Sequence, residues 1–558
     1  MENLIKIYCR NTDSYISVPG GSNLIDVYRL LKDKIDFEPI NAFVNNKSEA
    51  LTFPLYSPKT VEFLPVTSAS GNRTYVRSLC MMLYHAVASK LPGARLRIEH
   101  SLANGYYGTI DMGGSRITSP EVIKALEEHI RSLVEKDLPF KRKEDRTENV
   151  IEIFRNQGLD DKVKLLSTLH ELYTVYYTLD GLSDSYYGPL AASTGILKTF
   201  RLLPFNNGLL LLGPDRNNPS EPATPQPQPK MYEAFTDYVA FNHIVGIRNV
   251  GELNSAVDAG ESSTVINVSE ALHGNRIAAI ADEITRRFRK GEAKVVLIAG
   301  PSSSGKTTFS KRLAIQLMTN LVKPQTISLD DYFVDREKTP KDESGEYDYE
   351  SLYALDLEEF NRDINALING EEVELPYYNF ANGKREYRGN RISIGDDTIL
   401  LIEGIHGLNP ELTAQVPDRM KFRIYVSALT TISIDDHNWI PTTDNRLLRR
   451  IIRDAKYRGV SPAETISRWP SVRRGEERWI FPFQENADVM FNSSLLFELG
   501  VIKDRAERLL RQVPHDAREY AEAWRLRGFL NYFDSISEEF VPSTSLLREF
   551  LGGSSFKY

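Results

Sequence analysis

The stretch GPSSSGKT, Gly300–Thr307, constrains the fold of this 558-residue chain more than any other feature. It matches the pattern G-x-x-x-x-G-K-[ST] at every fixed position. The continuous apolar run Val295–Ala299 precedes it and predicts a buried strand, and the residues that follow place Phe309, Leu313 and Leu317 on one face of a helix. Glycines in such a loop allow backbone N–H groups to converge on phosphate oxygens at a helix N-terminus. We therefore expect a phosphate-binding loop (P-loop) rather than a serine-rich turn with a stray lysine.

The P-loop supplies the predicted contacts to a nucleotide. Lys306 is expected to reach the β- and γ-phosphates, and the Thr307 hydroxyl is expected to ligate Mg²⁺. The residues predicted to bind the nucleotide are Gly300, Ser302, Ser303, Ser304, Gly305, Lys306, Thr307 and Thr308. A P-loop indicates a bound nucleotide but does not by itself define the reaction.

Apolar runs recur after the P-loop and alternate with helical stretches. The runs are QTISLD, TILLIEG, FRIYV and ADVMF. This alternation predicts an α/β domain with a doubly wound parallel sheet over residues 269–514. Ligands of such sheets gather at the C-terminal ends of strands, where Asp330 and Asp331 follow one run and Glu403 ends another.

These strand-end carboxylates are the candidate catalytic and metal-binding groups. We expect Asp330 to take the proton of an acceptor hydroxyl, as a kinase requires, and to lie beside the metal. Glu403 is expected to hold Mg²⁺ directly or through water. Capping of a helix after the strand is the alternative role for Asp330 and Asp331.

The stretch NRLLRRIIRDAKYRG carries arginines at helical spacing. Arg446, Arg450 and Arg453 share one predicted helical face, and Arg458 lies just beyond them. Guanidinium groups that point one way suit a lid over a transferring phosphate. The alternative is a solvated basic face that acids such as Asp454 neutralise.

These motifs, in this order, resemble the uridine kinase and phosphoribulokinase family of P-loop kinases over about residues 290–510. The resemblance implies ATP and Mg²⁺ as cofactors and Asp330 as the catalytic base. It also implies that Lys306, Arg450 and Arg453 act in catalysis and that Arg458 contacts the nucleotide.

The acceptor side of the predicted site rests on the same resemblance. GEYDYESLYALD looks like the family's Tyr/Phe-Asp-His-Pro segment, which puts Asp348 on the ribose hydroxyls. LPYYNF resembles another family segment, which makes Tyr378 a contact of the nucleoside. Phe333 and Arg385 complete the predicted substrate contacts. The resemblance thus implies transfer of the γ-phosphate to the 5′-hydroxyl of a nucleoside, with uridine or cytidine as the first expectation.

The sequence also departs from the family pattern. The acceptor segment carries extra residues and lacks the His-Pro pair, a histidine that reads the pyrimidine aligns with Gly383, and Val460 replaces a lid arginine. The insertion ISIDDHNWIPTTD precedes the lid. Two alternatives therefore stay open. One is a sugar-phosphate kinase, for which Lys384, Arg385 and Arg388 are candidate phosphate contacts, and the other is an RNA-associated P-loop NTPase.

The N-terminal half resembles threonyl-tRNA synthetase. Residues 1–65 are similar to its ubiquitin-like (β-grasp) domain, and residues 66–268 are similar to its α+β editing domain, chiefly through NGYYGTID and LSDSYYGPL. The proline-rich stretch 214–230 predicts an exposed loop. Residues 515–558 predict a helical tail that packs on the kinase or on a partner. The expected architecture is thus an α/β kinase domain preceded by a β-grasp-like domain and an editing-like domain.

Cys80 and His85 lie on one predicted helix of the editing-like domain but do not have the spacing of a metal-binding pair. They are five residues apart, which separates them by about 140° around a helix. The positions that align with the zinc ligands of the synthetase hold Ser78, Met82, Tyr186 and Leu190. We expect no catalytic zinc and no tRNA editing, and instead a role in dimerisation or in regulating the kinase.

Composition and charge exclude several classes of protein. The net charge of −8 argues against a general nucleic-acid-binding protein, and the presence of only two cysteines suits a reducing compartment. No segment reads as a secretion signal, and no apolar run is long enough to span a bilayer. We expect a cytoplasmic protein that binds ATP and a nucleoside without a membrane or nucleic-acid partner, and homo-oligomerisation stays open.

Overall fold

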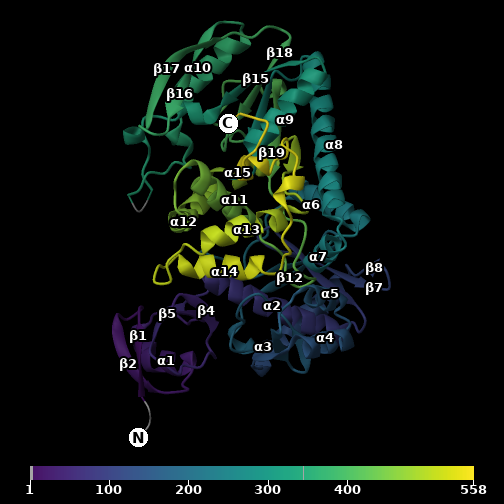
Figure 1. Ribbon diagram of the computed structural model, residues 1–558, viewed down its shortest axis with the longest axis vertical. Coiled ribbons are helices and arrows are strands. Elements are labelled where there is room, and N and C mark those ends of the chain that lie inside the picture. The colour runs from purple at the N-terminus through teal and green to yellow at the C-terminus, as the bar shows by residue number, and fades with distance from the viewer. Residues whose placement is uncertain (1–3, 343–344, 558) are drawn as a thin grey trace.

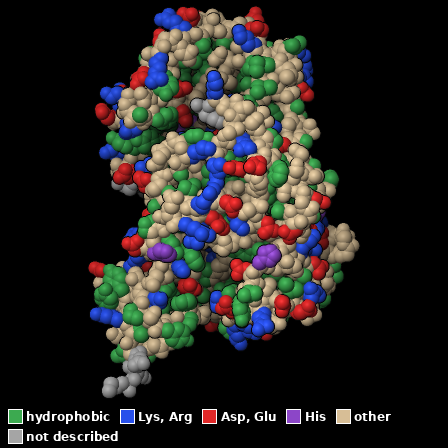
Figure 2. All heavy atoms as spheres, viewed as in Figure 1, with side chains coloured by type: hydrophobic (Ala, Val, Ile, Leu, Met, Phe, Trp, Pro, Cys, Tyr) green, Lys and Arg blue, Asp and Glu red, His purple; other side chains and the backbone are tan. Residues whose placement is uncertain are grey.

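The computed structural model describes residues 4–342 and 345–557 (Figure 1). The N-terminal β-sheet module and the α+β region that follows it lie at one end of the molecule, and the parallel-sheet domain occupies the other end. Acidic and basic side chains are interspersed over the face shown in Figure 2. None of the helices in the described ranges is long and apolar enough to cross a bilayer.

Residues 4–64 form a β-grasp fold, as predicted. Its elements are β1 (Leu4–Cys9), β2 (Ser14–Pro19), α1 (Leu24–Leu31), β3 (Asn41–Val44), β4 (Lys47–Ala50) and β5 (Lys59–Leu64). The sheet order is β2-β1-β5-β3-β4, in which β1 and β5 are parallel and the two hairpins are antiparallel. Val27 of α1 packs with Ile7, Val61 and Phe63 of the sheet, so one face of the sheet and the helix share a core.

Residues 69–212 build an α+β region around the long helix α2 (Ala69–Lys90). The strands are β6 (Arg95–Leu102), β7 (Gly105–Met112), β8 (Ser115–Arg116), β9 (Lys141–Arg146), β10 (Tyr173–Leu179), β11 (Leu182–Asp184), β12 (Arg201–Phe205) and β13 (Gly208–Leu212). The other helices are α3 (Pro120–Lys136), α4 (Thr147–Asn156) and α5 (Asp160–Thr168). Two antiparallel sheets result, β12-β13-β7-β6 and β11-β10-β9, and the buried Leu79 and Val87 of α2 belong to the core that they enclose.

The positions that align with the zinc ligands of the synthetase lie in this packed core. The residues there are Ser78, Met82, Tyr186 and Leu190, and all four are buried. Burial raises the pKa of the Cys80 thiol well above its ordinary value, as expected for a small apolar core residue. His85 faces His129 instead, with Nδ1 and Nε2 3.1 Å apart. In the described part of the chain, no group of three or more His, Cys, Asp or Glu could hold a metal ion.

The two halves are joined by helices rather than by a loop. The proline-rich stretch leads into α6 (Pro229–Val245), which is followed by α7 (Val250–Asp258) and α8 (Ser262–Arg289). Helix α8 is 28 residues long and continuous. The predicted boundary between residues 268 and 269 therefore falls inside a helix that both halves share.

The C-terminal half contains the predicted parallel sheet. Its strands are β14 (Val295–Ala299), β15 (Lys323–Ser328), β18 (Thr398–Glu403), β19 (Lys421–Ser427) and β20 (Val489–Asn492). The order is β15-β18-β14-β19-β20, and every neighbouring pair is parallel. All five strands coincide with the apolar runs of the sequence. Further elements are α9 (Lys306–Thr319), α10 (Leu357–Ile368), the hairpin β16 (Val373–Asn379) and β17 (Lys384–Ile392), α11 (Thr442–Tyr457), α12 (Pro462–Trp479) and α13 (Glu498–Leu510).

The C-terminal tail completes the core of the kinase-like half. Its helices are α14 (Tyr520–Leu530) and α15 (Arg548–Leu551). Phe529 and Phe550 of the tail are fully buried in one apolar cluster with Leu448 and Ile451 of α11 and Ile502 of α13. The predicted tail is therefore helical and packs on the kinase side of the molecule.

A buried ionic cluster, which we call the interdomain anchor, fixes the insertion before α11 to the α+β region. It consists of Lys162, Asp184, Asp435 and His437. Lys162 Nζ lies 2.8 Å from Asp184 and 2.9 Å from Asp435, and His437 Nδ1 lies 2.8 Å from Asp184. Burial alone would lower the pKa of Lys162, but the carboxylates outweigh it and raise that pKa. The sequence feature that looked like an unexplained insertion is thus an interdomain contact.

Replacing Lys162 with methionine should destabilise the whole molecule. The substitution leaves Asp184 and Asp435 buried without their cation, and breaking a buried pair in this way costs about 3–5 kcal/mol. For a chain of this length we expect the midpoint of thermal unfolding to fall by roughly 2–5 °C. The control is Lys124→Met, because Lys124 forms only an exposed pair with Glu128 at 3.9 Å. Equal, small shifts in both variants would contradict the structural role of the anchor.

Candidate active site

The P-loop joins the C-terminal end of β14 to the first turn of α9. Gly305 adopts φ 85° at the N-cap of α9, in the left-handed region that favours glycine. A Cβ atom on Gly300 would lie 2.0 Å from the carbonyl oxygen of Val426, so a larger residue does not fit there. Lys306 opens the helix, is buried, and donates to the Pro301 carbonyl at 3.3 Å. The first N–H groups of a helix lack intrahelical partners and carry the positive end of its dipole, which suits phosphate.

A cavity of about 1170 Å³ opens at this helix end, and we call it the P-loop cavity. The predicted site residues that line it are Ser302, Ser303, Gly305, Lys306, Thr307, Asp330, Phe333, Asp348, Tyr378, Glu403, Arg450, Arg453 and Arg458. Gly300, Ser304 and Thr308 are buried in the loop and in the first turn of α9. The fold thus brings together groups that are up to about 150 residues apart in the chain, although their chemical roles stay predictions.

Two strand-end carboxyl groups enter the cavity. Asp330 lies on the short 3-10 helix η3 (Leu329–Tyr332) directly after β15, and Glu403 ends β18. Burial raises the pKa of Asp330, although Lys306 opposes the shift. Burial also raises the pKa of Glu403 to about 7, again against the influence of Lys306. In the absence of bound cations, both groups therefore hold a proton more tightly than an exposed carboxyl group does.

Helix capping at η3 is carried out by Ser328 rather than by Asp330. The Ser328 hydroxyl accepts a hydrogen bond from the Asp330 N–H at 3.3 Å. Asp331 accepts the N–H of Tyr378 at 3.3 Å and so ties η3 to β16. The carboxyl group of Asp330 therefore faces the P-loop cavity, while that of Asp331 has a structural role and holds η3 against β16.

Thr307 and Glu403 fit a magnesium site. Thr307 Oγ1 donates to Oε2 of Glu403 at 3.4 Å, and Asp330 is close enough to raise the Glu403 pKa. Hydroxyl and carboxylate oxygens are hard ligands of the kind that Mg²⁺ prefers. Because Mg²⁺ usually keeps several waters and phosphate ligands, one or two protein oxygens are sufficient. The donor set is therefore consistent with the predicted ion.

Three of the predicted lid arginines point into the cavity. Arg450 Nη1 donates to Ser302 Oγ at 3.0 Å and so lies directly on the P-loop. Asp454 pairs with Arg450 at 3.3 Å, with Arg453 at 2.9 Å and with Arg458 at 3.5 Å. This single carboxylate holds three guanidinium groups at the cavity wall. Asp454, which the alternative interpretation used to neutralise a solvated basic face, therefore orients the arginines instead.

Arg446 does not belong to this group, contrary to the prediction from spacing. Its guanidinium is 1% exposed and donates to both carboxylate oxygens of Glu476, at 2.8 Å and 2.7 Å, in the core. The neighbouring Arg449, which the sequence analysis did not single out, is also buried and pairs with Glu498. Arg449 Nη1 donates to the Ser303 carbonyl at 3.4 Å, so it supports the P-loop from behind.

Aromatic side chains form the wall opposite the P-loop. The ring centroids of Phe333 and Tyr378 are 5.5 Å apart, and those of Tyr378 and Phe380 are 5.0 Å apart. Arg336 occupies the space beside Gly383, where a Cβ atom would lie 2.7 Å from its Nε. The position that aligns with a base-reading histidine is thus covered by an arginine that lines the cavity.

Arg385 was predicted to contact the substrate, but it is not among the residues that line the P-loop cavity. It pairs with Asp356 at 3.0 Å and with Glu359 at 2.7 Å, both at the N-terminal end of α10. Arg388 pairs with Glu386 at 2.8 Å and lies 3.6 Å from the Tyr377 ring centroid. These ion pairs engage Arg385 and Arg388, which the sequence analysis offered as contacts for a phosphate-bearing acceptor. The residues found on the cavity wall do not include Lys384, Arg385 or Arg388.

The sequence analysis did not single out four carboxyl groups of the cavity, those of Asp342, Glu346, Glu350 and Glu549. Glu350 lies within the acceptor segment GEYDYESLYALD, and burial raises its pKa to about 7. Glu549 comes from α15 of the tail, and its Oε2 accepts the Thr308 hydroxyl at 2.7 Å and the Thr308 N–H at 3.3 Å. Glu350 could have been noticed as an acid beside Asp348, but nothing in the sequence connects Glu549 with a loop more than 240 residues earlier.

Comparisons with known proteins agree with this geometry. Residues 295–495 match the model of the Phosphoribulokinase / Uridine kinase family. A uridine kinase from Staphylococcus aureus is 29% identical over 197 residues, which cover 35% of this chain and 86% of that enzyme. These matches confirm the kinase-family resemblance of the C-terminal half.

The second resemblance is also confirmed. A threonine–tRNA ligase from Desulforamulus reducens is 28% identical over 184 residues, which cover 33% of this chain but only 29% of the ligase. The chain therefore combines a kinase-family part with a part similar to a small portion of the ligase.

Among solved structures, one described as a "Possible Uridine Kinase" from Bacillus stearothermophilus shares 20% sequence identity with a TM-score of 0.24, over 36% of this chain and 89% of that chain.

Glu350→Gln should stabilise the nucleotide-free protein at alkaline pH. Because the folded-state pKa of about 7 exceeds the unfolded value, ionising Glu350 lowers the free energy of unfolding as pH rises from about 4.5 to above 7. The neutral amide avoids this loss. We expect the variant to be more stable than the wild type by at least about 1 kcal/mol at pH 8, with little difference at pH 4.5. Thermal melts at both pH values, with the exposed Glu346→Gln as control, test this, and a pH-independent difference would refute it.

Glu549→Gln should tighten ATP binding. The carboxylate accepts hydrogen bonds at the N-terminus of α9, where a phosphate would meet like charge. Removing that charge is expected to lower the Kd for ATP by roughly two- to tenfold. Isothermal titration calorimetry with ATP and Mg²⁺ provides the measurement, and Glu539→Gln, an exposed acid of the same tail, is the control. Unchanged or weaker ATP binding by Glu549→Gln would show that the carboxylate does not oppose the phosphates.

Proposed function

We propose that the protein is an ATP-dependent nucleoside kinase that transfers the γ-phosphate to the 5′-hydroxyl of a nucleoside, with a pyrimidine nucleoside as the first expectation. The observation that carries the proposal is one cavity that combines three parts. These are the P-loop with Lys306, the buried strand-end Asp330, and an aromatic wall with Phe333 and Tyr378. Kinase-family similarity over residues 295–495 supports the reaction class.

Asp330 is the proposed catalytic base. It lies at the end of β15 with Lys306 close enough to oppose the burial-driven rise of its pKa. A base in this position takes the proton of the acceptor hydroxyl as that oxygen attacks the γ-phosphorus and the bond to the ADP oxygen breaks. Mg²⁺ held by Thr307 and Glu403 would neutralise charge on the phosphates when bound.

The arginines of α11 are the proposed transition-state contacts. Arg450 already reaches the P-loop through Ser302, and Asp454 keeps Arg453 and Arg458 at the same wall. Phosphoryl transfer spreads negative charge over the γ-phosphate oxygens, and preorganised guanidinium donors stabilise that charge without having to move. Lys306 adds a further positive charge at the β- and γ-phosphates.

The acceptor is proposed to bind between the aromatic wall and the segment that carries Asp348. Phe333 and Tyr378 provide ring faces against which a planar base can stack. Asp348 would accept hydrogen bonds from the ribose hydroxyls, and Arg336 would contact the base edge in place of the family's histidine. A sugar-phosphate acceptor is the second candidate, because Arg468 and Arg474 of α12 also line the cavity.

An acceptor screen tests the proposal directly. The full-length protein would be incubated with ATP, Mg²⁺ and, in turn, each common nucleoside and a set of pentose phosphates, and products would be identified by mass spectrometry. We expect a nucleoside 5′-monophosphate and ADP. Product only from a sugar phosphate would favour the second candidate, and ATP hydrolysis that ignores every acceptor would favour an NTPase.

Asp330→Asn should separate binding from turnover. Loss of a positioned general base lowers turnover by at least about a hundredfold, while the P-loop contacts to ATP persist. The matched control is Asp331→Asn, because its amide oxygen can still accept the Tyr378 N–H. Lys306→Ala should instead weaken both ATP binding and turnover. Measurement of ATP affinity and of initial rates distinguishes these cases, and near-normal turnover in Asp330→Asn would remove it from the mechanism.

A further inference from the structure

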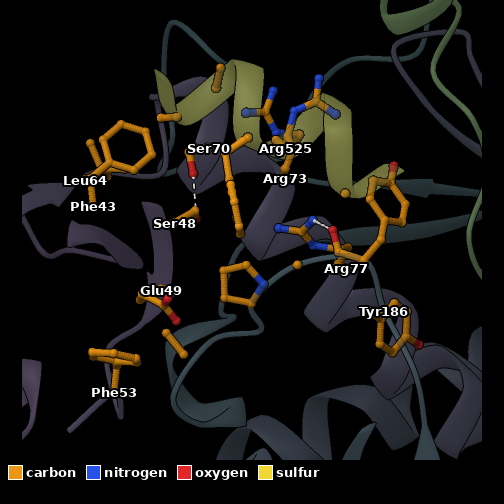
Figure 3. Close-up of a pocket in the computed structure, with 18 of the residues that line it drawn as sticks. Phe43, Ser48, Glu49, Phe53, Leu64, Ser70, Arg73, Arg77, Tyr186 and Arg525 are labelled. Carbon is orange, nitrogen blue, oxygen red and sulfur yellow. Dashed lines mark hydrogen bonds between the residues drawn. The ribbon is translucent and has the colours of Figure 1, made fainter. Parts of the chain in front are cut away.

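A second cavity, of about 1310 Å³, lies where the β-grasp module, the α+β region and helices α12 and α14 meet (Figure 3). We call it the interdomain cavity. The β-grasp module contributes Phe43 and Glu49, helix α2 contributes Arg73 and Arg77, and the tail contributes Trp524. No role proposed above uses this space. Its walls come from segments far apart in the sequence, so the cavity exists only in the assembled chain.

Arg77 is the unusual group in this cavity. Its side chain is buried, with 5% of its surface exposed, and it enters from α2 while Glu49 enters from the opposite side (Figure 3). Nη1 donates to the Tyr187 carbonyl at 3.1 Å and Nη2 to the Thr74 hydroxyl at 3.4 Å. Its buried Nε has no hydrogen-bond partner within residues 4–342 and 345–557, and the ion pairs found there include none with Arg77.

A buried guanidinium without a counter-ion is costly unless something pairs with it. Burial lowers the pKa of Arg77 to about 10, and the nearby Arg73 and Arg525 act in the same direction. The chain also makes room for this group, because a Cβ atom on Gly188 would lie 2.2 Å from Nη1 of Arg77. Three observations together indicate that Arg77 binds an anion. Its guanidinium is buried, its Nε has no partner among the described residues, and Gly188 leaves the space that the guanidinium occupies.

The two partly buried arginines of the cavity are already paired, whereas Lys141, Arg142 and Arg518, which also line it, are exposed to solvent. Arg73 pairs with Glu522 at 3.0 Å, and Arg525 pairs with Asp444 at 2.7 Å and also with Glu522. An extended nucleic-acid chain would instead require a row of free cations along an open groove. One unpaired, buried guanidinium therefore suits a single acidic group on a small molecule.

Aromatic side chains from all three parts contribute to the remaining wall. Tyr177, Tyr186 and Tyr187 stand on the α+β side, Phe43 on the β-grasp side and Trp524 on the tail. Aromatic faces bind planar apolar groups, and a cavity of this volume exceeds the roughly 300–1,000 Å³ of most small-molecule sites. Burial raises the pKa of Glu49 to about 7, so this carboxyl can also donate a hydrogen bond.

We propose that the interdomain cavity binds a nucleotide-sized organic anion, with its acidic group on Arg77 and its planar body among the aromatic side chains. The acidic group is a phosphate or a carboxylate, both of which match the planar donor array of a guanidinium. Ser467 and Pro470 of α12 line this cavity and also the P-loop cavity. The bound anion therefore contacts a helix that forms a wall of the candidate active site.

Titration calorimetry and tryptophan fluorescence on the full-length protein test the proposal. The phosphate probes are uridine and adenosine 5′-monophosphate, the carboxylate probe is indole-3-propionate, and uridine, adenosine and tryptophol are their uncharged counterparts. We expect at least one anion to bind, its uncharged counterpart to bind at least tenfold more weakly, and Trp524→Phe to remove the fluorescence change. Lys306→Ala, which should weaken nucleotide binding in the P-loop cavity, should leave this binding unaltered, because Lys306 does not line the interdomain cavity.

Variants at the buried arginine decide the outcome. Arg77→Gln should lower the affinity for the anion at least tenfold, whereas Arg131→Gln, a matched change at a cation–π arginine outside the cavity, should not. If Arg77→Gln fails to fold, Arg77→Lys gives a second test, because it keeps the positive charge but removes the planar donor array and should also weaken anion binding. The proposal is overturned if no probe binds, if only inorganic phosphate or an RNA oligonucleotide binds, or if anion binding ignores both Arg77→Gln and Arg77→Lys.

Discussion

The candidate active site depends on one backbone constraint, the turn that carries the chain from β14 into α9. Strand β14 lies in the middle of the parallel sheet, so its C-terminal end opens between the ends of β18 and β19. Gly305 in the left-handed conformation then directs the first N–H groups of α9 back toward that end. Because β15 and β18 lie together on one side of β14 and finish at the same edge, Asp330 and Glu403 both lie near the N-terminus of α9.

The rest of the chain supports this arrangement through buried charge. Arg449 braces the P-loop from behind, Asp454 holds the arginines of α11 in front, and Glu549 from the tail meets the first turn of α9. The start of α11 is fixed in turn, since the insertion that precedes it is paired through Lys162 with Asp184 of the α+β region. The tail therefore contributes Glu549 to the wall of the site, and the N-terminal half fixes the segment that leads into α11.

The sequence predicted the parts of the fold that depend on local pattern. Continuous apolar runs predicted all five strands of the parallel sheet, and the glycine spacing predicted the P-loop, because both signals lie within short windows. Ion pairing could not be read in this way. Arg446 has the spacing of a lid residue and Arg385 was expected among the substrate contacts, yet Glu476 and Glu359 bind them elsewhere. The change in composition at residue 268 did not reveal that helix α8 continues through the predicted boundary.

Positions that depend on long-range packing were missed altogether. Glu549 and Arg449 influence the P-loop, but their partners are distant in sequence and their own surroundings carry no motif. The interdomain cavity is a stronger case, since its arginines, aromatic side chains and Glu49 come from separate domains. The N-terminal half contains no continuous basic and aromatic run, and only the folded chain places Arg77 beside these rings.

The central claim is that the P-loop cavity transfers a phosphoryl group to a nucleoside rather than to water. The most direct test is a single-turnover reaction with ATP labelled with oxygen-18 in the γ-phosphate, in the presence of the nucleoside that supports turnover. Mass spectrometry then compares the label in nucleoside 5′-monophosphate with that in inorganic phosphate. The account predicts that nearly all of the label appears in the nucleotide product. Label found mainly in inorganic phosphate, with the nucleoside unchanged, would contradict it.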